Sequence, residues 1–199
     1  MSGKPTPNLL EFIFRMFSYC FGTKVIGLEN IPKSGPLILA CNHLSNFDPI
    51  LMGGFAGKRR HSIYIMKKEI ASWPFLSWLF KHYEYIYIDR KRKGGDLHAL
   101  KEALKVLKNG ESLALFPEGT RSKTGQIGKA KAGIGFLVYH SGAPIVPIRI
   151  VDSDKLPFKW GPKVIFGKPF SIKADENRPV KEQYQEFADK VMNEIKKLK

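Results

Sequence analysis

One histidine and one aspartate are spaced closely enough to act as a base and its orienting partner. His43 and Asp48 stand five residues apart, directly after an apolar run at residues 36–41. Such a run predicts a buried strand, so we expect His43 just past its carboxyl end, where open α/β sheets bind ligands. If the segment folds back, the carboxylate accepts from one ring nitrogen and raises the basicity of the other. On its own the pair favours an ordinary loop, so the function depends on other segments that meet it.

Composition narrows the class of protein. The chain has 199 residues, which is typical of one domain with a real core. Its 33 Lys and Arg against 18 Asp and Glu give a net charge of +15, which suits nucleic acid, an anionic membrane surface or phosphorylated substrates. The two cysteines, Cys20 and Cys41, indicate reduced thiols in a cytosolic setting. We interpret Cys41 as a core residue rather than a nucleophile, because cysteine is common in cores.

The order of the predicted elements indicates a single α/β domain with a mixed, largely parallel sheet flanked by helices. We expect strands at residues 22–28, 36–41, 63–66, 85–88, 113–116, 144–150 and 163–166. We expect helices at residues 8–21, 49–55, 72–80, 96–108, 129–141 and 180–198, with a basic loop at 57–61. In the helix at 96–108, Asp96 is the expected cap and the inward residues are Leu97, Leu100, Leu104 and Leu107.

The N-terminal helix is unusual because it is apolar nearly all round. Its polar residues Asn8, Glu11, Arg15 and Ser18 recur at helical spacing and form one narrow stripe. A helix of this length, about 21 Å, is too short to cross a hydrocarbon core of about 30 Å. It is either a core helix under the sheet or a membrane-associating helix in the interface, and its aromatic residues favour the interface. We therefore divide the chain into an interfacial helix at 1–24 and an α/β domain at 25–199.

Three predicted strand exits carry polar groups. They hold His43 with Asp48, then Arg90, then the residues from Glu118 to Ser122. If the strands are parallel neighbours, all three exits open onto one edge of the sheet. This convergence is what makes the His43–Asp48 pair a candidate site.

These same segments resemble the signature blocks of the glycerolipid acyltransferases, in order and spacing, over roughly residues 25–150. Asn42-His43, four residues and Asp48 resemble the first block, an HX4D motif, and residues 116–122 resemble the third. Lys67, Glu69, Pro74 and Asp89-Arg90 are similar to the second block, and residues 146–148 to the fourth. Within the family, the bacterial branch that acylates 1-acyl-glycerol 3-phosphate is the most similar. Ser77 stands where the second block usually has glycine, and one apolar N-terminal helix stands where better-known members have two.

The resemblance and the residue chemistry imply the same mechanism. His43, oriented by Asp48, takes the proton from a glycerol hydroxyl as that oxygen attacks an acyl thioester, so no acyl-enzyme is needed. Backbone N–H groups around Gly119 and Thr120 are the expected oxyanion donors. The acceptor phosphate is expected to bind Arg90 and Arg121. For Lys67 and Lys131, phosphate binding and an ordinary surface charge are equally expected. Glu118 either accepts from the acceptor's glycerol or orders its own loop.

Several alternatives stay open from the sequence. The acceptor is 1-acyl-glycerol 3-phosphate, another lysolipid or glycerol 3-phosphate, the donor is acyl-CoA or acyl carrier protein, and a His/Asp lipid hydrolase uses the same base. We expect no nucleic-acid partner, because no known binding motif is present. We expect no cofactor and no metal, because His61, His82, His98 and His140 have no ligand spacing with His43. The expected location is the cytoplasmic face of the cell membrane, peripheral or monotopic, on an anionic lipid surface.

Overall fold

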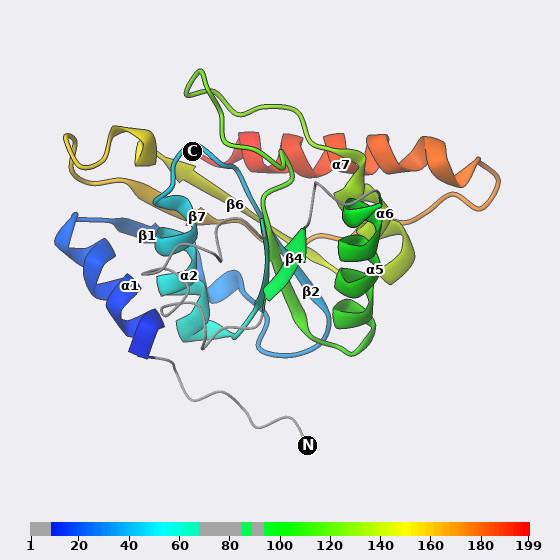
Figure 1. Cartoon of the computed structure of the whole chain (residues 1–199), viewed down its shortest axis with the longest axis horizontal. Coiled ribbons are helices and arrows are strands. Elements are labelled where there is room, and N and C mark those ends of the chain that lie inside the picture. The colour runs from blue at the N-terminus through cyan, green and yellow to red at the C-terminus, as the bar shows by residue number, and fades with distance from the viewer. Residues whose placement is uncertain (1–8, 68–84, 89–93) are drawn as a thin grey trace.

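One sheet of seven strands organises the computed structural model, which describes residues 9–67, 85–88 and 94–199 (Figure 1). Across the sheet the order is β1 (Lys24–Ile26), β7 (Lys163–Phe166), β6 (Ile145–Val151), β2 (Leu37–Cys41), β5 (Ser112–Leu115), β3 (Ile63–Lys67) and β4 (Tyr85–Ile88). Neighbouring strands are parallel except for β6 and β7, which are antiparallel. The predicted α/β architecture with a largely parallel sheet is therefore confirmed.

The central strand β2 is buried along its whole length, as expected for a parallel strand covered on both faces. Alternate residues point to opposite faces of the sheet. Leu37, Leu39 and Cys41 pack into one apolar cluster, whereas Ile38 and Ala40 pack into the other. The segment that follows β2 is thus held by the best-packed part of the protein.

Helices cover the two faces of the sheet unequally. The face with Ile38 is covered by α5 (Gly95–Lys108), α6 (Ala132–Ser141) and α7 (Val180–Lys197). The other face is covered by α2 (Asp48–Arg59), and α1 (Leu9–Cys20) packs against α2 (Figure 1). Two short 3-10 helices, η1 (Leu28–Asn30) and η2 (Ser153–Lys155), complete the described elements.

Two details of the predicted elements are wrong. The basic loop expected at 57–61 begins as helix, because α2 continues to Arg59. Its end is fixed when Arg59 donates to the Ile31 carbonyl at 3.2 Å and Arg60 donates to the Gly110 carbonyl at 3.0 Å.

The inward face of α5 also differs from the prediction. Leu97 is 52% exposed, and the buried residues of this helix are Gly95, Ala99, Ala103 and Leu107. Gly94, not Asp96, occupies the cap position. Leu107 is buried, and Leu100 and Leu104 are partly buried against the same core, so Leu97 is the one residue of the predicted inward stripe that faces solvent.

Glycines in α2 allow α1 to lie unusually close. A Cβ at Gly54 would stand 2.7 Å from the Arg15 amide nitrogen, and one at Gly57 would stand 2.3 Å from the Glu11 carboxyl carbon. Glu11 and Ser18, two members of the polar stripe, are buried. Four large apolar residues of α1 are about half exposed: Phe12, Ile13, Met16 and Tyr19. The helix therefore buries Glu11, Phe14 and Ser18 on its inner side and turns these four apolar residues outward.

Within the described ranges, no helix has both the length and the apolar character that crossing a membrane requires. The predicted helix at 72–80, with Pro74 and Ser77, lies outside the described residues, as do Glu69 and Asp89-Arg90.

Candidate active site

The His43–Asp48 pair forms as the spacing predicted. His43 Nδ1 and Asp48 Oδ2 are 2.9 Å apart, with the histidine side chain 18% exposed and the aspartate fully buried. Because Nδ1 faces the carboxylate, it carries the proton in the neutral ring, and Nε2 is left as the basic nitrogen. Nε2 has no hydrogen-bond partner among the described residues. The arrangement presents an oriented base at a partly open position.

The aspartate is fixed by the turn that it closes. Its Oδ2 also accepts from the backbone N–H groups of Leu44 at 2.6 Å and Ser45 at 2.7 Å. Asp48 is the first residue of α2, where a negative charge is favoured by the helix dipole. Its other oxygen, Oδ1, is buried without a hydrogen-bond partner in the described part of the chain. Three of the turn's hydrogen bonds thus converge on one carboxylate oxygen.

The loop after β5 holds His43 from the other side. The His43 N–H donates to Glu118 Oε1 at 3.0 Å, and the Ser122 N–H donates to the His43 carbonyl at 2.8 Å. The imidazole stacks on the Phe116 ring, with centroids 4.1 Å apart and 19° between the planes. Strands β2 and β5 are parallel neighbours, so their carboxyl ends meet at this edge as expected.

A buried asparagine locks the turn to β6, the other neighbour of β2. Asn42 Nδ2 donates to the Ile150 carbonyl at 2.9 Å, and Asn42 Oδ1 accepts from the Ile150 N–H at 2.8 Å. Such a two-way contact satisfies both ends of a buried amide. His43 is thereby held between the two strands that flank β2.

Glu118 accepts backbone hydrogen bonds through both of its carboxylate oxygens. Oε1 binds the His43 N–H, and Oε2 accepts from the Gly128 N–H at 3.1 Å. Burial raises the pKa of the Glu118 carboxyl, and these two backbone N–H groups act in the opposite direction. Of the two roles predicted for Glu118, the ordering of the loop is the one that the geometry shows. Gly128 was missed, because an isolated glycine in a loop has no distinctive sequence signal.

Gly119 occupies a conformation and a space that suit only glycine. Its φ is +67°, and a Cβ there would lie 3.0 Å from Cδ and Cε of Lys131. The Gly119 N–H donates to the Phe116 carbonyl at 3.0 Å, so this expected oxyanion donor already has an acceptor. The Thr120 N–H has no acceptor among the described residues. Lys131 lies against the turn, which places its stem beside the candidate site.

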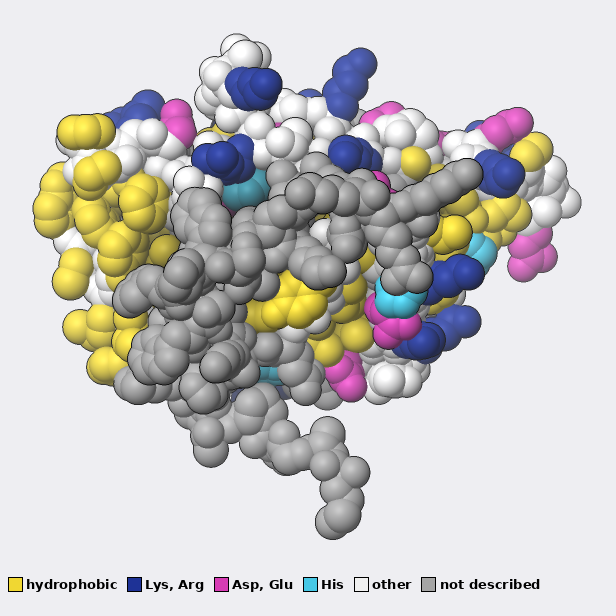
Figure 2. Space-filling model, in the orientation of Figure 1, with side chains coloured by type: hydrophobic (Ala, Val, Ile, Leu, Met, Phe, Trp, Pro, Cys, Tyr) yellow, Lys and Arg dark blue, Asp and Glu magenta, His cyan; other side chains and the backbone are white. Residues whose placement is uncertain are grey.

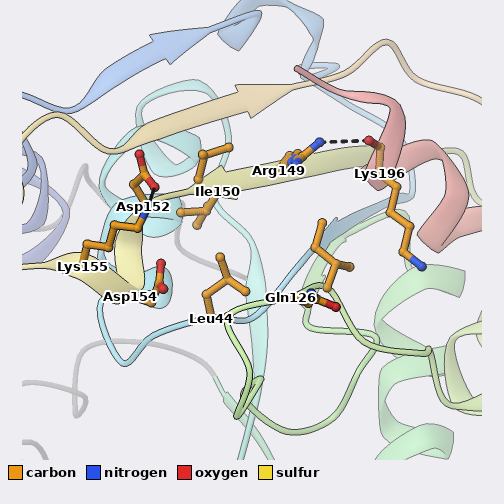
Figure 3. Close-up of a pocket in the computed structure, with 11 residues that line it drawn as sticks. Leu44, Gln126, Arg149, Ile150, Asp152, Asp154, Lys155 and Lys196 are labelled. Atoms are coloured by element: carbon orange, nitrogen blue, oxygen red, sulfur yellow. Dashed lines mark hydrogen bonds and ion pairs between the residues drawn. The ribbon is translucent and has the colours of Figure 1, made fainter.

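Two cavities flank the loop after β5. One of about 410 Å³ is lined by residues of this loop, including Arg121, Lys123 and Lys129. The other, of about 520 Å³, is lined by Leu44, Gln126 and the exit of β6. Figure 3 shows Leu44 and Gln126 across this second cavity from Arg149 and Ile150. Gln126 and Ile127 line both cavities, so the loop separates two spaces, one of which reaches Leu44 and the other Glu118.

The remaining predicted residues are only partly described. Arg121 and Thr120 are exposed on the loop after β5. Lys67 is the last residue of β3, which runs parallel to β5 and so ends at the same edge as β2. Arg90 lies outside the described residues.

The cysteine beside the pair is not a nucleophile. Burial raises the pKa of the Cys41 thiol well above its ordinary value, and the charges of Asp48 and Glu118 raise it further. A protonated, fully buried thiol fits the structural role expected for it. In the described ranges, no cluster of three or more His, Cys, Asp or Glu side chains could hold a metal ion.

Comparisons with known proteins agree with one another. Residues 22–151 match the family model described as Acyltransferase. The chain is 36% identical over 146 residues to the probable 1-acyl-sn-glycerol-3-phosphate acyltransferase of Mycoplasma pneumoniae, covering 69% of this chain and 53% of the relative. It is 30% identical over 181 residues to the 1-acyl-sn-glycerol-3-phosphate acyltransferase of Bacillus subtilis, covering 89% of this chain and 88% of that protein.

A solved structure has the same fold. It is the crystal structure of the 1-acyl-sn-glycerophosphate acyltransferase PlsC from Thermotoga maritima, with a TM-score of 0.68 at 24% identity. The match covers 94% of this chain and 78% of that one. The chain spans about half the length of the first curated relatives that it matches, which are the Mycoplasma proteins.

Proposed function

The chain belongs to the acyltransferase family, and we propose that it transfers an acyl chain from a thioester to the free hydroxyl of 1-acyl-glycerol 3-phosphate. The product is phosphatidic acid, and the reaction is a step of phospholipid synthesis. The names of the Mycoplasma pneumoniae and Bacillus subtilis relatives support this choice of acceptor.

The observation that carries the proposal is the 2.9 Å contact between His43 Nδ1 and Asp48 Oδ2. Nε2 takes the proton of the acceptor hydroxyl while the hydroxyl oxygen bonds to the thioester carbonyl carbon. When the tetrahedral intermediate collapses, the C–S bond breaks and His43 returns the proton to the leaving thiolate. Asp48 stabilises the imidazolium between these two proton transfers. No group on the protein is acylated, because the acceptor oxygen is itself the nucleophile.

The loop after β5 supplies the remaining polar groups. The Thr120 N–H is the proposed oxyanion donor, because it has no acceptor in the described part of the chain. Arg121 binds the acceptor phosphate through its forked guanidinium, with Arg90 and Lys67 contributing from the exits of β4 and β3. Glu118 acts as a positioning residue, since both its oxygens bind backbone N–H groups.

We place the enzyme on the cytoplasmic face of the cell membrane, where acyl-CoA or acyl carrier protein brings the donor. The apolar side of α1 is turned outward and lies in the lipid interface, while its polar side binds α2. The net charge of +15 adds attraction to anionic lipid. Docking of this kind brings the site to an acceptor that is embedded in the membrane.

The test is thiol release from acyl-CoA or acyl carrier protein with lysophosphatidate, glycerol 3-phosphate or a neutral lysolipid as acceptor. We expect release to depend on lysophosphatidate and to match the phosphatidate formed mole for mole. Release of free fatty acid without an acceptor would instead identify a hydrolase that uses His43 on water. A preference for glycerol 3-phosphate or a neutral lysolipid would reject the proposed acceptor while preserving the acyl transfer.

A further inference from the structure

The loop between β6 and β7 exposes two aromatic side chains to solvent. Phe158 is 95% exposed and Trp160 is 64% exposed. The loop follows η2 and ends where β7 begins at Lys163. Exposed large apolar groups are ordinary when they are scattered singly, but a contiguous group marks a surface that another phase or molecule covers. The question is therefore whether these two residues belong to a larger patch.

The loop is joined to the end of α1. The Trp160 ring lies 5.3 Å from the Phe21 ring, and the Gly161 N–H donates to the Phe21 carbonyl at 2.8 Å. In the next strand, the Lys24 N–H donates to the Pro162 carbonyl at 2.9 Å. Figure 1 shows α1 and this loop on the same side of the molecule, and Figure 2 shows hydrophobic side chains gathered along that side. Trp160 is thus joined to the end of α1, and Phe158 lies two residues before it on the same loop.

Positive charge borders this patch. Lys24 and Lys163 are partners in the register of β1 and β7, both are exposed, and neither forms an ion pair among the described residues. Lys155 and Lys159 lie at 2.5 Å and 2.9 Å from the two oxygens of Asp152, and Asp154 stands beside Lys155, so the excess positive charge of the patch comes from Lys24 and Lys163. Aromatic side chains beside lysines suit an anionic lipid surface, where the rings enter the interface and the ammonium groups meet headgroups.

The patch lies at the edge of the sheet that carries the active site. β6 runs parallel to β2, so the loop leaves β6 at the edge where His43 follows β2. β1 is parallel to β7, and β7 is antiparallel to β6, so the start of β1 and the end of α1 are also at this edge. Phe17 of α1 stacks on Phe47, the residue before Asp48, with ring centroids 5.6 Å apart. Lipid that covers Phe158, Trp160 and the outer side of α1 would thus border the turn that carries His43 and Asp48.

We propose that Phe158 and Trp160 form a second membrane-docking element, which enters the interface of an anionic bilayer together with α1. This inference deepens the proposed function and rests on the docking of α1. Two separate contacts, α1 and this loop, fix the orientation of the protein on the membrane surface, whereas α1 alone would let the protein rotate about the helix axis. The sheet edge with His43 is thereby kept facing the lipid.

Phe158→Ser is the primary test, because a side chain that is 95% exposed has little packing to lose. Binding is measured by sedimentation with vesicles of phosphatidylcholine and phosphatidylglycerol. We expect partition to weaken by about tenfold for Phe158→Ser at unchanged melting temperature, and by about a hundredfold when Trp160→Ser is added. The matched control is Leu97→Ser on α5, a residue that is 52% exposed and belongs to the opposite helix layer. Loss of binding in this control equal to that of Phe158→Ser would overturn the proposal, as would normal binding of the double variant.

A second readout separates this loop from α1. With Trp73 and Trp78 replaced by phenylalanine, Trp160 is the single tryptophan of the chain. We expect its emission to shift to the blue on anionic vesicles and to be quenched by lipids that carry a quencher in the acyl chain. If the protein binds vesicles but the Trp160 emission is neither shifted nor quenched, the loop does not enter the membrane, and the docking of α1 is unaffected by this result. Quenching of Trp160 by an added protein partner in the absence of vesicles would assign the patch to a protein interface and reject the lipid. Failure of the acyl-transfer assay in detergent would reject the enzyme function independently of either result.

Discussion

The turn at residues 42–48, which carries His43 and Asp48, and helix α1 both bury polar groups, but with different consequences. In the turn, Asp48 is fully buried and its Oδ2 accepts three hydrogen bonds, from His43, Leu44 and Ser45. In α1, Glu11 and Ser18 are buried against α2, while Phe12 and Met16 face outward. The aspartate of the first region is shielded from water and its histidine ring is partly exposed, whereas the second region meets water at its apolar side.

The difference indicates what each region is built to meet. A buried, paired carboxylate restricts a neighbouring base to one tautomer and one orientation, which serves a small polar reaction centre. An outward apolar side has no such internal use, and its exposure costs free energy until another apolar phase covers it. Substitutions in the turn should therefore change turnover, whereas substitutions on the outer side of α1 should change only access to lipid.

The largest expected effect is in the turn. His43→Ala should lower turnover by about two to four orders of magnitude, the usual contribution of a positioned general base. The ring is partly exposed, so the fold should survive its removal, which circular dichroism and thermal melting would check. Turnover within a few-fold of wild type in a folded variant would contradict the assignment of the base.

Substitutions on the outer side of α1 should weaken membrane binding and leave the chemical step unchanged. Phe12→Ser with Met16→Ser should weaken vesicle binding by about ten- to a hundredfold, because two large apolar side chains no longer enter the interface. Activity on a short-chain, water-soluble acceptor should be retained. We prefer this pair to Phe17, which stacks on Phe47 and lies 4.6 Å from the Phe21 ring, so that its removal would also disturb packing. Loss of activity on the water-soluble acceptor together with loss of vesicle binding would identify α1 as an ordinary core helix.

The inner side of α1 supplies the matched comparison. Gly54→Ala places a Cβ 2.7 Å from the Arg15 amide nitrogen, which is too close, and the backbone of α1 cannot move away easily. We expect a destabilisation of about 1–3 kcal/mol, the usual cost of overpacking. Differential scanning calorimetry of Gly54→Ala and wild type measures it. A melting temperature equal to wild type would show that α1 is not packed closely on α2.

The smallest effect is expected in the loop after β5. Arg121→Lys keeps the charge and loses the forked geometry, so the KM for lysophosphatidate should rise by about tenfold while the KM for the thioester stays constant. Arg121 is exposed, so stability should be unchanged. A rise confined to the KM for the thioester would move this guanidinium from the acceptor to the donor.

Sequence reasoning succeeded where the determinants are local. The spacing of His43 and Asp48 is sufficient to predict their contact, because five residues form a single turn between a strand and a helix. The exits of β2 and β5 meet because these strands are parallel neighbours, as the order of elements indicated, whereas Arg90 lies outside the described residues.

The failures arise where long-range packing decides. The link from His43 to Glu118 joins residues 75 positions apart, and its second half depends on Gly128, whose role exists only in the folded loop. Helical periodicity in α5 correctly placed Leu100, Leu104 and Leu107 toward the core. It wrongly included Leu97 and omitted the buried Ala99 and Ala103, because small residues add little to the periodic signal. The prolonged α2 was missed because its glycines, which weaken a helix locally, are required by contact with α1.

A double-mutant cycle on turnover tests the central claim most directly. It compares wild type, His43→Ala, Asp48→Asn and the double variant on lysophosphatidate and one thioester. If Asp48 acts only through His43, Asp48→Asn should lose much of what His43→Ala loses, and the double variant should be within about threefold of His43→Ala alone. Losses that multiply in the double variant would contradict the account, because they would give Asp48 a catalytic role independent of the histidine.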